Sequence, residues 1–313
     1  MKLFLKNIGK IGKATVQTNG VTVIAGKNDT GKSTINKAIF SVLNGFHRSE
    51  SLHTSAEDVL QSVLERELNA AFRGQLQNIY SDGDGKIELK LDGKIASVCL
   101  RNGRISEIER PIGKWRANVF YNLRAWNPAL LLQSDNAENY KQSERIYAII
   151  AKICGGEIAA TNDNMELGSR TEKSGGAVAL KNLSPSLESF LILKTLLQNN
   201  LMGKDSILLL DEPESHLHPE RQLLYAELLI LLHKELGVRV LLNTHSYYFL
   251  DAIEVYSQKY DMADKCLFYL ASVNGDFATM TDVTGNTEVI YQEFARPLQL
   301  LENERYCILP FAV

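Results

Sequence analysis

The sequence has few cysteines and no long apolar run. Its four cysteines lie far apart and form no Cys-x-x-Cys pair, so the chain encodes neither a zinc ribbon nor a disulfide framework. No segment approaches the roughly 18 uninterrupted apolar residues of a membrane span, and positions 1–6 are too few for the apolar part of a signal peptide. We therefore expect a cytoplasmic protein that has no membrane partner.

The sequence also lacks a large excess of either charge. Its net charge is −3 over 313 residues, with 45% hydrophobic and 23% charged residues, which is the composition of a soluble globular protein. Such a balance argues against coating nucleic acid by bulk charge. The first 37 residues are an exception, because they contain seven lysines and Asp29 as the one carboxylate. Phosphate binding explains part of that local excess, so contact with nucleic acid stays open.

Hydrophobic periodicity predicts strands and helices in alternation. In the first half we expect strands at 1–8, 14–17, 21–25, 86–91, 95–100 and 117–121, and helices after residue 32 and at 50–75. In the second half we expect helices at 184–200, from Pro219 to the C-cap Gly237, and at 289–301, with buried strands at 207–210 and 238–242. Two further strands, at 266–271 and 277–281, are expected at a sheet edge.

This alternation of apolar strands with amphipathic helices favours a mainly parallel sheet that is covered on both faces. No heptad repeat extends over the sequence, so long coiled-coil arms are not expected. We expect one domain over residues 1–313, with a variable insertion of strands and helices between residues 50 and 180.

A complete phosphate-loop pattern, G-x-x-x-x-G-K-[ST], lies at Gly26–Ser33 between a predicted strand and a predicted helix. The glycines let the backbone curl around phosphate oxygens, Lys32 reaches the β and γ phosphates, and Ser33 ligates Mg²⁺. The residues assigned to nucleotide binding here are Gly26, Lys27, Asn28, Asp29, Thr30, Gly31, Lys32, Ser33 and Thr34. The pattern predicts that the chain binds Mg²⁺ and a nucleotide that carries β and γ phosphates.

Two acids follow the apolar strand 207–210, at the sheet edge where the phosphate loop is expected. Asp211 is predicted to hold the Mg²⁺ shell together with Ser33, and Glu212 to polarise a water for attack on the γ phosphate. A strand that simply ends in solvated acids is the alternative. His216 and His218 also suggest a metal site, but a closed zinc site needs four ligands and no further cysteine or histidine is adjacent.

The motifs, and their order along the chain, resemble those of ATP-binding-cassette ATPases. They are most similar to the branch of chromosome-maintenance, recombination-repair and overcoming-lysogenization-defect ATPases, in a short form without a nuclease domain or long coiled coil. Asp211–Pro219 looks like the Walker B motif and D-loop, and Leu242–Ser246 looks like the switch-histidine segment. The resemblance implies an α/β P-loop fold with a parallel core sheet, an antiparallel β subdomain and a helical insertion.

The same resemblance implies roles for individual residues. His245 would contact the γ phosphate and support Glu212, which makes Lys32, Glu212 and His245 the catalytic set. Residues 215–217 would cross to a second subunit. The nucleotide would then lie between two copies of the chain.

The segment that would close the ATP site from the second subunit departs from the family pattern. Ser184 and Ser186 are assigned to nucleotide binding there, but Pro185 stands where the family has serine and Glu188 would repel a phosphate. Ser184 as an N-cap before a first-turn proline explains the same residues without nucleotide. Ser174–Gly176 is a rival signature by its residue types.

The sequence leads to two hypotheses of function. The first is an ATP-hydrolysing switch, a homodimer or higher homo-oligomer, that controls a separately encoded effector such as a nuclease or toxin, or a nucleic-acid transaction, as in anti-phage defence. The second is a slow or non-hydrolysing scaffold, locked by ATP, that restrains such a partner; Pro185 and Glu188 favour it. A transporter-associated ATPase is a third reading, against which the residues at 214–219 argue.

Overall fold

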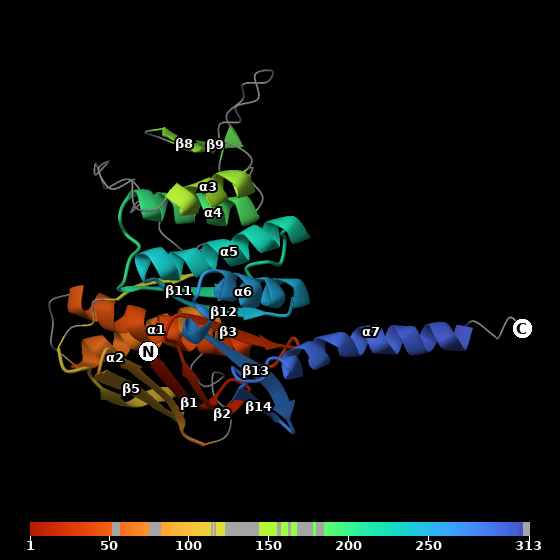
Figure 1. Cartoon of the computed structure of the whole chain (residues 1–313). Coiled ribbons are helices and arrows are strands. Elements are labelled where there is room, and N and C mark those ends of the chain that lie inside the picture. The colour runs from red at the N-terminus through yellow and green to blue at the C-terminus, as the bar shows by residue number, and fades with distance from the viewer. Residues whose placement is uncertain are drawn as a thin grey trace, which may run out of the picture.

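The protein is described by a computed structural model. It describes residues 1–51, 57–74, 83–113, 115, 117–122, 144–154, 158–161, 164–167, 178–179 and 185–308. Its centre is an eleven-stranded sheet with the strand order β6-β5-β4-β1-β2-β14-β13-β3-β12-β11-β7 (Figure 1). A small second sheet holds β8 (Ile158–Thr161), β9 (Asn164–Leu167) and β10 (Val178–Ala179).

One half of the large sheet is parallel, as predicted. Its strands are β7 (Asn118–Tyr121), β11 (Ser206–Asp211), β12 (Arg239–Thr244), β3 (Val21–Gly26) and β13 (Cys266–Asn274). All six residues of β3 are buried, because helices cover both faces of this half. In register, Asp211 lies opposite Asn243, and Asn243 lies opposite Ile24, so the carboxyl ends of these strands form one edge.

Helices cover the two faces of the parallel half in layers. The helices are α1 (Lys32–Ser51), α2 (Glu57–Phe72), α3 (Glu144–Cys154), α4 (Pro185–Gln198), α5 (Pro219–Leu236) and α6 (Tyr247–Lys259). Leu208 and Leu210 point into a core shared with α3–α6, whereas Ile207 and Leu209 point into a core shared with α1 and α2. Figure 1 shows α3 and α4 stacked outside α5, and α1 and α2 on the opposite side of the sheet.

The other half of the sheet is antiparallel. It consists of β1 (Lys2–Ile8), β2 (Ile11–Gln17), β4 (Gly85–Leu91), β5 (Lys94–Arg101) and β6 (Arg104–Glu109). Along β1, Leu3, Leu5 and Ile8 are buried under α1 and α2, while Lys2 and Lys6 are exposed. Both the predicted parallel core and the predicted antiparallel strands are therefore confirmed. Strands from the predicted insertion, β4–β7, are built into the same sheet.

Two predicted edge strands are internal, so that prediction was wrong. Strand β13 lies between β3 and β14 (Phe277–Asp282), and β14 joins the antiparallel half through Ala278 opposite Ile11. Their late position in the chain gave no sign that they bridge the two halves of the sheet.

The helix boundaries differ modestly from prediction. Helix α4 begins at Pro185, α5 ends with Gly237 at φ 71° as its C-cap, and a short 3-10 turn, Ala263–Lys265, precedes β13. The last helix, α7 (Glu288–Ile308), is longer than expected and projects from the body of the molecule (Figure 1). Among the residues described, no helix is long and apolar enough to cross a membrane.

Candidate functional site

The phosphate loop links β3 to α1, as the sequence predicts. Gly26 has φ 153°, and a Cβ there would lie 2.4 Å from the carbonyl oxygen of Ala271, so only glycine fits. Gly31 has φ 76°, which also favours glycine. Asp29 adopts a positive φ of 68°, and its carboxylate accepts a 2.6 Å hydrogen bond from Lys10. These backbone conformations curl the loop in front of the first turn of α1.

Lys32 lies inside this loop. Its side chain is buried, and its Nζ donates to the carbonyl oxygens of Gly26 at 2.8 Å and Lys27 at 2.5 Å. Burial lowers the pKa of Lys32, and the nearby carboxylates of Glu212 and Asp211 oppose that shift. The loop carbonyls thus hold the ammonium group inside the loop, close to the carboxylates of Glu212 and Asp211.

The other predicted loop residues occupy the positions that the pattern requires. Asn28 is exposed, and the Thr30 hydroxyl donates to the carbonyl oxygen of Lys27 at 2.9 Å. Ser33 and Thr34 lie in the first turn of α1 and are half-buried, with the Thr34 amide bonded to the carbonyl of Gly31 at 3.1 Å. The N-terminus of α1 therefore faces the loop, the arrangement in which helix amides bind anions.

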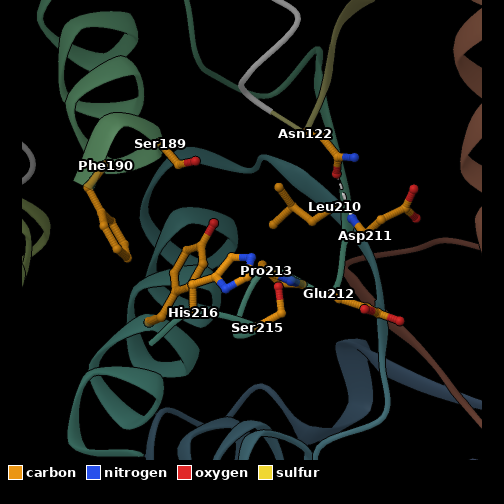
Figure 2. A pocket seen from close by; sticks show the side chains of 10 residues that line it. Asn122, Ser189, Phe190, Leu210, Asp211, Glu212, Pro213, Ser215 and His216 are labelled. Atoms are coloured by element: carbon orange, nitrogen blue, oxygen red, sulfur yellow. Dashed lines mark hydrogen bonds between the residues drawn. The ribbon is translucent and has the colours of Figure 1, made fainter. Parts of the chain in front are cut away.

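Asp211 is held by donors from three other elements. Its Oδ1 accepts from Asn36 Nδ2 at 2.7 Å and from Asn243 Nδ2 at 2.5 Å, and its Oδ2 accepts from the Tyr121 hydroxyl at 2.6 Å. Its backbone amide donates to Asn122 Oδ1 at 2.7 Å, the bond drawn in Figure 2. These contacts fix the orientation of the carboxylate, as outer-shell groups do for a metal ligand.

Sequence reasoning missed these partners of Asp211. Burial first, and then the charge of Asp211, raise the pKa of Tyr121, so its hydroxyl stays protonated and donates. The Tyr121 ring also packs against Phe40, with centroids 5.4 Å apart. Available signals were the position of Tyr121 at the end of a predicted strand, and Asn36 one helical turn after Lys32 on the same face.

Glu212 and His245 meet at the same sheet edge. His245 Nδ1 lies 3.3 Å from Glu212 Oε1, and both side chains remain partly exposed, at 46% and 38%. Glu212 has a positive φ of 48°, and its amide donates to the carbonyl oxygen of Asn243 at 3.0 Å. Backbone conformations of this kind cost energy and cluster at functional sites. The pair predicted from the sequence is thus brought into contact where water reaches it.

Glu214 is a further acid near this edge that sequence reasoning did not assign. It is only 2% exposed; its Oε1 accepts from the Thr244 hydroxyl, and its Oε2 has no hydrogen-bond partner among the residues that the structure describes. Burial raises the pKa of Glu214. The Thr244 hydroxyl oxygen accepts from the Ser246 amide at 3.0 Å, and Ser246 caps α6. The segment after Asp211 is therefore bonded to the segment that carries His245.

The residues after Glu214 split into exposed and buried positions. Ser215 and His216 are exposed, whereas Leu217 is buried in this chain's own core, so only the first two are available to a second subunit. A pocket of about 80 Å³ lies between α4 and the turn that contains Ser215 and His216. Figure 2 shows that the side chains of Asp211 and Glu212 point away from His216. No cluster of three metal-ligating side chains occurs among the residues described, including those around His216 and His218.

The predicted signature residues are only partly visible. Ser184 and the rival segment at 174–176 lie outside the described residues, and Ser186 is described only as part of helix α4. That helix begins at Pro185. The approach of this segment to a nucleotide therefore stays a prediction.

The residues present fit a nucleotide with Mg²⁺. Ser33 and Asp211 offer a hydroxyl and a carboxylate, the oxygen ligands that Mg²⁺ prefers alongside phosphate oxygens and water. A Cβ at Gly26 would clash with the Ala271 carbonyl oxygen, Gly31 has a positive φ that favours glycine, and Lys32 is directed at the loop interior. With Ser33 and Asp211, Mg²⁺ would neutralise phosphate charge at this edge.

Comparison with protein families gives a match to part of the chain. The family model described as "AAA domain, putative AbiEii toxin, Type IV TA system" matches residues 118–251. That range runs from β7 into α6 and so contains Asp211, Glu212 and His245 but not the phosphate loop. It covers less than half of the chain. No curated protein gave a match.

Solved structures give similarity over nearly the whole chain. An Smc head bound to the C-winged helix domain of ScpA has 15% identity and a TM-score of 0.55, covering 92% of this chain and 98% of that one. The SMC head domain from Thermotoga maritima has 16% identity and a TM-score of 0.51, and the similarity covers 90% of this chain and 98% of that one.

A third similar structure is an Smc head domain with an extended coiled coil, bound to the C-terminal domain of ScpA derived from Pyrococcus furiosus. It has 13% identity and a TM-score of 0.54, and the similarity covers 97% of this chain and 98% of that one. At these identities the similarity establishes the fold. The chain has the P-loop fold of SMC heads and ATP-binding-cassette ATPases, as the motifs predict.

Proposed function

We propose that the chain binds ATP with Mg²⁺ and hydrolyses it to ADP and phosphate. The observation that carries this proposal is the convergence of three groups at one edge of the parallel sheet. They are Lys32 in the phosphate loop, Asp211 held by side-chain donors, and the contact between Glu212 and His245. This combination supplies phosphate binding, a metal ligand and a base beside water.

Each side chain has a distinct part in the reaction. Lys32 exchanges its loop carbonyl contacts for phosphate oxygens. Glu212 takes a proton from water as the water oxygen bonds to the γ phosphorus and the bond to the β–γ bridging oxygen breaks, which leaves ADP. His245 donates a hydrogen bond to the γ phosphate and keeps Glu212 in place.

A second copy of the chain would complete the site. Glu212 and His245 are partly exposed in a single subunit, and closing the site would exclude bulk water from the reaction. Ser215 and His216 are exposed in the turn that follows Glu212, and Ser184 and Ser186 of the second copy would approach the nucleotide. The functional unit is thus a homodimer or a higher homo-oligomer.

We assign to this ATP-dependent assembly the control of a separate effector protein in the cytoplasm, a nuclease or a toxin, in anti-phage defence. The description of the matching family, which names a toxin and a toxin–antitoxin system, supports this. Hydrolysis would reset the assembly and change its hold on the effector, because a ligand that binds one state better shifts the equilibrium. A nucleic-acid transaction is the other process that such a switch serves.

The test is the Glu212→Gln variant. We expect its kcat for ATP hydrolysis to fall at least about 100-fold, because a positioned general base contributes roughly 100- to 10,000-fold. Native mass spectrometry with ATP and Mg²⁺ should show a dimer that ADP does not support. Glu220→Gln, an exposed acid in the first turn of α5, is the matched control and should hydrolyse like wild type. Unchanged hydrolysis by Glu212→Gln would show that the base is wrongly assigned.

A slow or non-hydrolysing scaffold is the second candidate, and the start of α4 at Pro185 favours it. Proline has no amide hydrogen to donate to a phosphate across the dimer. Under this alternative, replacing Pro185 with serine and Ser186 with glycine should raise turnover at least about 10-fold. The same turnover before and after the replacement counts against it.

A further inference from the structure

The antiparallel half of the sheet has one face that α1 and α2 do not cover. Side chains alternate along each strand, so every second residue of β1, β2 and β4 lies on this outer face. We call its five lysines the lysine face; they are Lys2 and Lys6 on β1, Lys13 on β2, and Lys86 and Lys90 on β4. All are exposed except Lys86, which is half-buried.

The strand register sets these lysines side by side. Lys6 lies directly opposite Lys13 on one neighbouring strand and directly opposite Lys86 on the other. Lys2 lies opposite Lys90. The lysine face therefore consists of one row of three lysines and one row of two, both running across the strands.

Such a pairing is unfavourable for the fold alone. Like charges directly opposite each other in a sheet destabilise it, and here three opposed pairs occur in a chain whose net charge is −3. Glu88, which lies between the rows, pairs with Lys86 at 2.7 Å. Among the described residues, the other four lysines take part in no ion pair. Asp84, just before β4, accepts a 2.6 Å hydrogen bond from Arg101, and this bond and, to a smaller extent, the charge of Lys6 lower the pKa of Asp84. Two further acids, Glu107 and Glu109, lie on β6.

The spacing of the two rows matches a duplex. The rows are four residues apart along β1, which at about 3.3 Å per residue is roughly 13 Å. The major groove of B-form DNA is about 12 Å wide, and its minor groove is about 6 Å wide. Ammonium groups in two such rows can each reach the phosphates of one strand along the major groove.

We propose that the lysine face binds the sugar–phosphate backbones of double-stranded DNA, with its two rows on either side of the major groove. The contacts are electrostatic and independent of sequence, because lysine side chains meet phosphates and not base edges. Binding at this face does not require ATP hydrolysis, so it stands apart from the proposed function. A switch protein with such a face would act on or along DNA.

Fluorescence anisotropy with a labelled duplex of about 30 base pairs, without nucleotide, tests this proposal. Five phosphate contacts predict a slope of about −4.5 for log K against log salt, which is roughly a 500-fold loss of affinity between 50 and 200 mM NaCl. The double variant Lys6→Gln, Lys13→Gln should flatten the slope by about two and weaken binding at 50 mM at least about 10-fold.

A matched control carries the same change of charge elsewhere. Lys152→Gln with Lys204→Gln removes two exposed lysines from α3 and from the segment before β11, and it should bind like wild type. Equal losses in both double variants, or no loss in the first, would overturn the proposal. Thermal melting of the first variant at or above the wild-type temperature shows that its fold is intact, since removing a repulsion does not destabilise the sheet.

Two other nucleic acids test the fit to the groove. Single-stranded DNA of the same length should bind at least several-fold more weakly, because it offers one backbone and no groove. Duplex RNA should also bind more weakly, since its major groove is deep and narrow. Equal or tighter binding of either would overturn the match to the DNA major groove.

Discussion

The two halves of the large sheet bury their strands differently. The parallel half has helices on both faces, so neighbouring residues such as Leu208 and Leu209 are both fully buried. The antiparallel half is covered on one face, so Leu5 is buried and Lys6 is exposed. Polar chemistry in the parallel half is therefore confined to strand ends, where Asp211 and His245 lie. In the antiparallel half it can spread along the strands.

The sharpest test of this difference compares one substitution in each half. Leu209→Ala removes a fully buried side chain from β11, and we expect the free energy of unfolding to fall by about 2–5 kcal/mol. Thr15→Ala on the outer face of β2 should cost less than about 1 kcal/mol. Urea unfolding followed by circular dichroism measures both. Equal losses would mean that the outer face of the antiparallel half is covered in solution.

The sequence predicts those parts of the site whose residues lie close together in one short motif. The phosphate loop, Asp211 and Glu212 could be predicted because each motif contains its own strand, loop or helix signal. Their supporting donors could not, because Tyr121 meets Asp211 only if β7 lies beside β11, a pairing between distant segments. The same reason explains why β13 and β14 were predicted at an edge.

The second prediction concerns the strand-end chemistry of the parallel half. Tyr121→Phe removes the hydroxyl that donates to Asp211 and keeps the ring that packs on Phe40. We expect the Mg²⁺ concentration for half-maximal binding of a fluorescent ATP analogue to rise about 10-fold, in the range typical of outer-shell groups. Nucleotide binding in EDTA should not change. Tyr256→Phe on α6 is the control; an equal effect of both variants would exclude a specific role for Tyr121.

The third prediction concerns Glu214, a buried acid at the same edge. Burial raises its pKa above the ordinary value of 4.5, so the folded state holds the proton more tightly than the unfolded state. This contribution to stability is complete below about pH 4.5 and is lost as the pH rises through the folded-state pKa. Glu214→Gln cannot ionise, so its melting temperature minus that of wild type should increase from pH 5 to pH 8.

The size of this pH effect follows from the shift, with each unit of pKa worth about 1.4 kcal/mol. Glu220→Gln is the exposed control and should follow wild type at both pH values. A constant difference in melting temperature between Glu214→Gln and wild type would mean that Glu214 ionises normally in the folded protein.

The smallest effect is expected in the antiparallel half and has the opposite sign. Lys6 lies between Lys13 and Lys86, so Lys6→Glu converts two opposed pairs of like charge into two opposed pairs of opposite charge. Because cross-strand pairs contribute roughly 0.2–1 kcal/mol each, the variant should be more stable than wild type by up to about 1 kcal/mol, with the gain reduced by salt. Lys2→Gln, which relieves a single repulsion from Lys90, should gain less. A loss of stability in Lys6→Glu at low salt would show that the lysine side chains do not repel one another, and the argument that the face is kept for a ligand would lose its basis.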